Sequence, residues 1–217
     1  MKQKIHFVVT LVFIVVLLAV VSFGQWNARK ELVFADSLTE VAVTVDGSEL
    51  TLSDMAFYIA YQENKIEETA RIYNMEDTGE YWALHGGQMF LREEAKQTTI
   101  DMAIHDEIFY QMALAEGIEL TEDECEHLAN DQYDFWNDLE EEQQQALGVE
   151  QEVINESMRR IALAEKYQYL FAEMSGESFE AYTIGEPAYE RLLEKHDYEV
   201  EDSVWDRVDF GGITVDH

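Results

Sequence analysis

The stretch Ile100-Asp-Met-Ala-Ile-His-Asp-Glu-Ile-Phe-Tyr-Gln-Met-Ala113 places apolar residues on nearly every side of a helix. A helix of this kind is buried in the middle of a protein instead of lying on its surface. The helical pattern extends over residues 88–116, with Gly86-Gly87 before it and Gly117 in the position that commonly follows a helix. The sequence therefore predicts a mainly α-helical bundle with this helix at its centre.

Further helices are predicted on the C-terminal side of the central one. Thr121 and Glu124 form the pattern of a capping box, which indicates that a helix starts there and runs to about Leu139. An acidic and amide-rich run and a short turn around Gly148 follow. The next apolar periodicity then predicts a helix over about 150–174.

On the N-terminal side, the sequence predicts a short strand and another helix. Val41-Ala-Val-Thr-Val45 alternates and is β-branched, and Asp46-Gly47 supplies a turn. Thr51, with Asp54 three residues later, is a helix N-cap. Apolar residues at helical spacing then continue to Tyr73.

The C-terminal part changes character after a linker at 175–185. Pro187 suits the first turn of a short helix that ends near His196. The apolar residues between Val200 and Val215 are separated by acids and glycines, which favours a mixture of short helix and strand. We expect residues 186–217 to complete the same core as the preceding helices, so that 32–217 is a single domain.

The N-terminal segment, residues 1–31, contains an apolar run from Phe7 to Gly24 that only Thr10 and Ser22 interrupt. Roughly 18 apolar residues are enough to span a bilayer, whereas signal peptides have shorter apolar cores. The run therefore predicts one transmembrane helix that anchors the protein. A signal peptide removed after Ser22 or Gly24 is the alternative.

The predicted location is the cell membrane, with a single pass and the domain on the extracytoplasmic side. Lys2 and Lys4 are nearly balanced by Arg29 and Lys30, so the flanking charges encode the orientation only weakly. Cleavage of the signal would instead give a secreted protein. No cysteine stands at the end of the apolar run to accept a lipid.

The charge of the chain excludes one class of partner. The formal net charge is −32, and because residues 1–31 carry four basic side chains and one acid, the remainder carries −35. Such a field repels nucleic acid. Cys125 is the only cysteine, so no intramolecular disulfide is possible and stability must come from packing.

The sequence carries none of the common signatures of enzymes. No G-x-S-x-G, glycine-rich phosphate loop, CxxC or HExxH pattern is present. His127 shares a helix face with Glu124 and Asp131, but an acidic solvated face explains the same residues. We therefore predict no catalytic residue, no metal site and no cofactor.

Aromatic and methionine residues are plentiful for so acidic a chain. Most of them are expected in the core, but a surplus clusters on and near the first helix, and such side chains adapt to varied apolar partners. We predict that a client-binding cleft is formed by Phe57, Tyr58, Tyr61, Tyr81, Trp82, Phe135 and Trp136.

Two segments in this order resemble a known family. Val43-Thr-Val-Asp-Gly-Ser-Glu-Leu-Thr51 and Ala113-Leu-Ala-Glu-Gly-Ile-Glu-Leu-Thr-Glu-Asp-Glu124 are similar to the SurA N-terminal region and its PrsA and trigger-factor relatives. The resemblance spans about Val41 to Lys166. It implies a SurA N-terminal-like helical bundle that binds unfolded or exported polypeptides outside the cytoplasm.

Family members often carry a parvulin domain before a closing helix, and here the 175–185 linker is too short to contain one. We therefore expect a chaperone without isomerase catalysis. Two alternatives stay open: a relative of the peptidyl-prolyl isomerases with a degenerate catalytic unit, and a membrane-bound scaffold for one protein partner.

The anchor prediction can be tested by fractionation. We expect the full-length chain to remain in the membrane fraction after a carbonate wash, because the run from Phe7 to Gly24 is long enough to span the bilayer. Recovery of only a soluble chain that begins near Gln25, identified by mass spectrometry of its N-terminus, would show cleavage instead.

Overall fold

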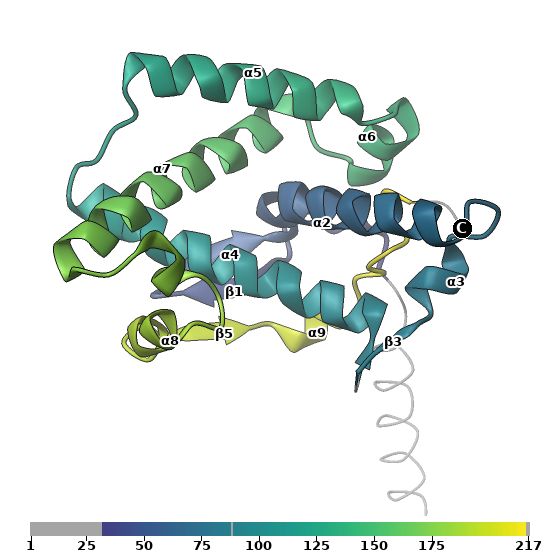
Figure 1. Ribbon diagram of the computed structural model, residues 1–217. Coiled ribbons are helices and arrows are strands. Elements are labelled where there is room, and N and C mark those ends of the chain that lie inside the picture. The colour runs from purple at the N-terminus through teal and green to yellow at the C-terminus, as the bar shows by residue number, and fades with distance from the viewer. Residues whose placement is uncertain (1–31, 88, 216–217) are drawn as a thin grey trace, which may run out of the picture.

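Helices make up most of the computed structural model, which describes residues 32–87 and 89–215 (Figure 1). The long helices are α2 (Leu52–Tyr73), α4 (Leu91–Ala115), α5 (Glu122–Asp138) and α7 (Gln151–Ser175). The short helices are η1 (Phe34–Asp36), α3 (Gly79–Trp82), α6 (Glu141–Leu147), η2 (Phe179–Tyr182), α8 (Pro187–Leu193) and α9 (Asp202–Trp205). The strands are β1 (Val41–Val45), β2 (Ser48–Thr51), β3 (His85–Gly86), β4 (Met89–Phe90) and β5 (Tyr198–Val200). The mainly α-helical class predicted from the sequence is confirmed.

The central helix is α4, as the sequence predicts. It crosses the middle of the molecule, with α2 and α7 on one side and β5 and α9 on the other (Figure 1). It packs against both α7 and α2, and Ile100, Ala103, Ile108 and Phe109 are buried. Its first residue is Leu91 instead of the predicted 88, because β3 and β4 pair as a small hairpin just before it.

A three-stranded antiparallel sheet covers part of the bundle in the order β2-β1-β5. Asp46 and Gly47 both have positive φ, 49° and 83°, as a two-residue hairpin turn requires. The Asp46 carboxylate accepts a hydrogen bond from the backbone N–H of Asp197 at 2.9 Å and contacts His196 Nδ1 at 2.6 Å. The turn is therefore attached to the segment that leads into β5.

One helix was not predicted. Residues 140–148 were expected to form an acidic run and a turn, but α6 occupies Glu141–Leu147. The side chain of Gln143 accepts from the backbone N–H of Glu140 at 2.8 Å, which completes a capping box, and Gly148 ends the helix in the left-handed conformation. Leu147 is fully buried, so packing as well as capping holds this helix.

The C-terminal segment lies in the same core as the helices. The side chains of Val204, Trp205, Val208 and Phe210 are buried in the cluster formed by α2 and α4. Lys96 of α4 donates to the carbonyl oxygen of Val208 at 3.1 Å, and its ammonium lies 5.8 Å from the centroid of the Trp205 ring.

A buried carboxylate attaches the end of this segment to α2. Glu63 is fully buried and accepts hydrogen bonds from the backbone N–H groups of Gly211, Ile213 and Thr214 and from the hydroxyl of Thr214. Burial raises the pKa of Glu63, while these four donors oppose the shift. The C-terminal turn is therefore built around one acidic side chain of α2.

The helices formed by residues 32–87 and 89–215 include none long and apolar enough to cross a bilayer. The predicted transmembrane helix, within residues 1–31, lies outside the described residues.

Substitution of Glu63 tests the closure of the core. Glu63→Gln points an amide N–H₂ at backbone N–H donors, so we expect a loss of about 2–3 kcal/mol of stability and faster proteolysis at the C-terminus. Urea unfolding measures the loss. Glu68→Gln, at an exposed position of the same helix, is the control. Equal unfolding midpoints for both variants and the parent would contradict this role for Glu63.

Candidate functional site

The helix α5 buries none of its residues, although it is four to five turns long. A surface helix normally buries an apolar stripe against the core. In α5 the apolar residues Leu128, Phe135 and Trp136 are only half-buried, and a hollow lies on each flank of the helix. The candidate binding surfaces are therefore the two hollows beside α5.

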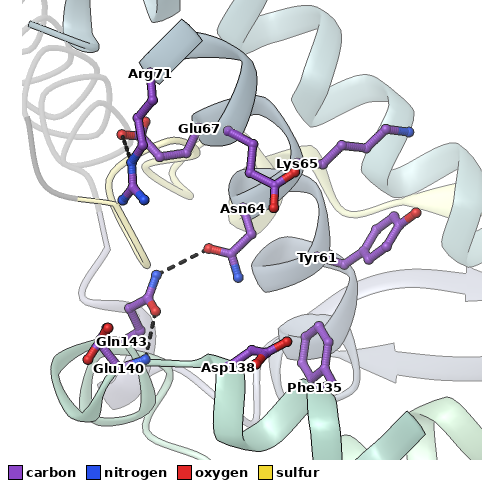
Figure 2. Close-up of a pocket in the computed structure, with 10 residues that line it drawn as sticks. Tyr61, Asn64, Lys65, Glu67, Arg71, Phe135, Asp138, Glu140 and Gln143 are labelled. Atoms are coloured by element: carbon purple, nitrogen blue, oxygen red, sulfur yellow. Dashed lines mark hydrogen bonds and ion pairs between the residues drawn. The ribbon is translucent and has the colours of Figure 1, made fainter. Parts of the chain in front are cut away.

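The first hollow, the α2–α5 cleft, lies between the second half of α2 and the segment where α5 ends and α6 begins (Figure 2). Its volume is about 620 Å³. Aromatic side chains line one end and polar side chains the other. The lining residues are Tyr61, Asn64, Lys65, Glu67, Glu68, Arg71, Phe135, Asp138, Glu140 and Gln143.

Three aromatic rings meet at the apolar end of the α2–α5 cleft. Phe57 stacks on Tyr61 with ring centroids 5.9 Å apart, and the Phe57 and Phe135 centroids are 4.8 Å apart. Phe57 is buried, whereas Tyr61 is 40% exposed and Phe135 is half-buried. Phe57 therefore supports the two rings that face the cleft, Tyr61 from α2 and Phe135 from α5 (Figure 2).

Hydrogen bonds between side chains hold the polar end of the cleft. Gln143 donates to the Asn64 side chain at 3.1 Å and to the carbonyl oxygen of Thr214 at 2.7 Å, so it joins α6 to α2 and to the C-terminal turn (Figure 2). Arg71 Nε lies 3.5 Å from the Glu67 carboxylate. The first turn of α6 is thus held at a set position relative to α2.

Three of the seven predicted client-binding residues come together at the cleft: Phe57, Tyr61 and Phe135. Trp136 is half-buried, and its backbone carbonyl accepts from Gln144 at 3.0 Å. Tyr81 packs against Tyr73, with ring centroids 5.5 Å apart, away from the residues that line the cleft.

Trp82 and Tyr58 correct the prediction, because both side chains are buried and present no surface to a client. Trp82 is 1% exposed and donates its indole N–H to the Glu67 carboxylate at 3.0 Å. Burial, followed by the nearby charge of Asp106, raises the pKa of Tyr58 well above its ordinary value. Both residues belong to the core, where an aromatic side chain with a polar partner is stable.

The second hollow, the α5–α7 groove, was not predicted. It has a volume of about 510 Å³, and its apolar lining consists of Leu120, Leu128, Ala162, Tyr169 and Leu170. The spacing of the last three on α7 indicated a packed face, yet Tyr169 is 53% exposed. Helical periodicity shows that side chains share a face, but it does not show whether another element covers that face.

The acidic side chains of α5 serve to attach it. Glu124 lies 2.6 Å from the ammonium of Lys166 on α7, and it also accepts from the backbone N–H of Thr121 at 2.6 Å. Gln132 donates to the carbonyl oxygen of Asn155 at 2.7 Å. Within the described part of the chain, no group of three His, Cys, Asp or Glu side chains is arranged to hold a metal ion.

Comparisons with known proteins find no similar one. No protein-family model matches the chain, no curated protein matches it, and no solved structure matches it. The geometry of the two hollows beside α5 is therefore the basis for inferring function.

The pairing of Glu124 makes a pH-dependent contribution to stability. The hydrogen bonds from Lys166 and Thr121 lower the pKa of Glu124 from 4.5 to about 2. Because the folded-state pKa is depressed, the contribution is fully present above about pH 4.5 and is lost as the pH falls toward 2. We expect Glu124→Gln to unfold at lower denaturant concentration than the parent at pH 7, with the difference shrinking below pH 4.5.

Glu122→Gln, in the same first turn of α5, is the matched control. A parent-minus-variant difference for Glu124→Gln that stays constant from pH 7 to pH 2.5 in urea titrations would show that the carboxylate does not act through its charge.

Proposed function

We propose that this protein is an extracytoplasmic, membrane-anchored chaperone that binds apolar segments of unfolded or exported polypeptides in the α2–α5 cleft, without isomerase catalysis. The observation that carries the proposal is the incomplete burial of α5. A native helix that leaves its aromatic end half-covered beside a hollow offers the apolar surface that a client needs.

The composition of the cleft suits clients of varied sequence. Tyr61 and Phe135 supply contact area with few rotatable bonds, so they bind many apolar side chains at a low entropy cost. The polar end, with Lys65, Arg71 and Asp138, offers charges of both signs to a client backbone or side chain. Specific recognition of one ligand generally requires a more enclosed site with converging polar groups.

Two features outside the cleft support the same proposal. The formal charge of −35 outside residues 1–31 keeps a protein with exposed aromatic surface soluble. The resemblance of Val43–Thr51 and Ala113–Glu124 to the SurA and PrsA chaperones adds a family context in which clients are bound outside the cytoplasm.

An aggregation assay tests the proposal. We expect residues 32–217 to suppress aggregation of several unrelated denatured proteins at near-stoichiometric ratios. Serine at both Tyr61 and Phe135 should raise the concentration needed for half-protection by about tenfold, which corresponds to a loss of about 1.4 kcal/mol of apolar contact. Met174→Ser, at an exposed apolar position near the end of α7, is the control and should leave protection unchanged.

Two results would contradict the proposal. Protection of one protein with no effect on the rest would favour a scaffold for a single partner. Acceleration of X-Pro isomerisation in a short peptide, in proportion to protein concentration, would favour a catalytic role. Circular dichroism of each variant separates loss of binding from loss of folding.

A further inference from the structure

The α5–α7 groove differs from the α2–α5 cleft in its lining. Its floor is aliphatic and aromatic, with Leu128 contributed by α5 and Ala162 and Leu170 by α7. Tyr169 borders it and stacks on Phe179, with ring centroids 4.1 Å apart. Stacking restricts the Tyr169 ring, so this half-exposed wall is already ordered before anything binds.

The charges around this groove are mainly negative. Glu124, Asp131 and Glu165 line it, and Lys166 is the single lysine among its lining residues. Lys166 is paired with Glu124 at 2.6 Å. Asp131 and Glu165 are exposed and have no ion-pair partner within residues 32–87 and 89–215. The rim therefore presents two uncompensated carboxylates, one on each side of the apolar floor.

The walls of the groove limit the conformation of an occupant. Both walls are helices whose backbone groups bond within their own helix, so no free strand edge is present for an extended peptide to pair with. An extended segment would leave its own N–H and C=O groups against apolar side chains, which is costly. A helix satisfies those groups internally and presents apolar residues at i, i+3, i+4 and i+7.

From the apolar floor and the carboxylates at its rim, we propose that the α5–α7 groove binds an amphipathic helix with an apolar face flanked by Lys or Arg. The apolar face contacts Leu128, Tyr169 and Leu170, and the basic side chains reach Asp131 on one side and Glu165 on the other. This site is separate from the α2–α5 cleft, because none of its lining residues belongs to that cleft.

The test uses the full-length protein in nanodiscs of zwitterionic lipid, with an environment-sensitive fluorophore on Cys125. This residue is the only cysteine, is exposed and follows Glu124 of the rim. The probe is a peptide of about four helical turns with leucine at i, i+3, i+4 and i+7 and lysine on both flanks. We expect saturable binding, and about tenfold weaker binding when glutamate replaces the lysines.

Charge reversal on the protein is the reciprocal measurement. Asp131→Lys with Glu165→Lys should weaken the lysine peptide by about five- to tenfold and strengthen the glutamate peptide. Glu126→Lys with Glu177→Lys makes the same change in net charge, and Glu126 lies about half a turn around α5 from Glu124. This control pair should change binding by less than about twofold, since a general electrostatic field would affect both pairs alike.

Three outcomes would overturn the proposal: equal binding of lysine and glutamate peptides, equal binding of a proline-broken peptide of the same composition, or no binding of any peptide. Tyr61→Ser in the α2–α5 cleft should leave binding of the lysine peptide unchanged. Loss of aggregation suppression in that variant, with the peptide still bound, distinguishes failure of the chaperone proposal from failure of this one.

Discussion

The carboxylate of Glu63 is the interaction on which the arrangement of the C-terminal half depends. It lies fully buried on α2 and accepts hydrogen bonds from the backbone of Gly211 and Thr214 and from the Thr214 hydroxyl. A buried carboxylate without partners is strongly unfavourable, and four donors from one turn compensate for its desolvation. The turn can adopt this position only when α2 is folded, so the two ends of the domain are coupled.

The same turn positions the candidate cleft. The carbonyl oxygen of Thr214 accepts from Gln143, and the Gln143 side chain also donates to Asn64, one residue after Glu63 on α2. The first turn of α6 is thereby attached to α2 through the C-terminal turn. Since α5 ends immediately before α6, the polar end of the α2–α5 cleft depends on Glu63 although that residue does not line it.

The core and α5 are held with different strength. Inside the bundle, Arg160 of α7 pairs with the buried Glu107 of α4 and lies over the Tyr110 ring at 4.7 Å, so charged groups there are fully partnered. The helix α5 is attached by exposed or half-buried contacts, of which the Glu124–Lys166 pair is one. Exposed ion pairs contribute little to stability. A well-packed core with a lightly attached helix is the distribution of stability that binding surfaces commonly require.

Local sequence determined the secondary structure where a short-range pattern acts alone. The capping boxes at Thr51 and Thr121 begin α2 and α5, Asp46-Gly47 forms the hairpin turn, and the all-round apolar pattern of α4 places it at the centre. Each of these signals acts over a few residues, so no distant contact is needed to read it. The helix α6 was missed because its acidic composition obscured its own capping box.

Tertiary structure alone decided which of the aromatic residues are exposed. Tyr58 and Tyr61 lie one helical turn apart on α2, but only Tyr61 faces a hollow, because α4 and α7 cover the side where Tyr58 lies. Trp82 is buried because Glu67 and Phe210, both distant in sequence, surround it. Periodicity groups side chains on a face, whereas exposure depends on which other elements pack there, and that is set by contacts between segments far apart in the chain.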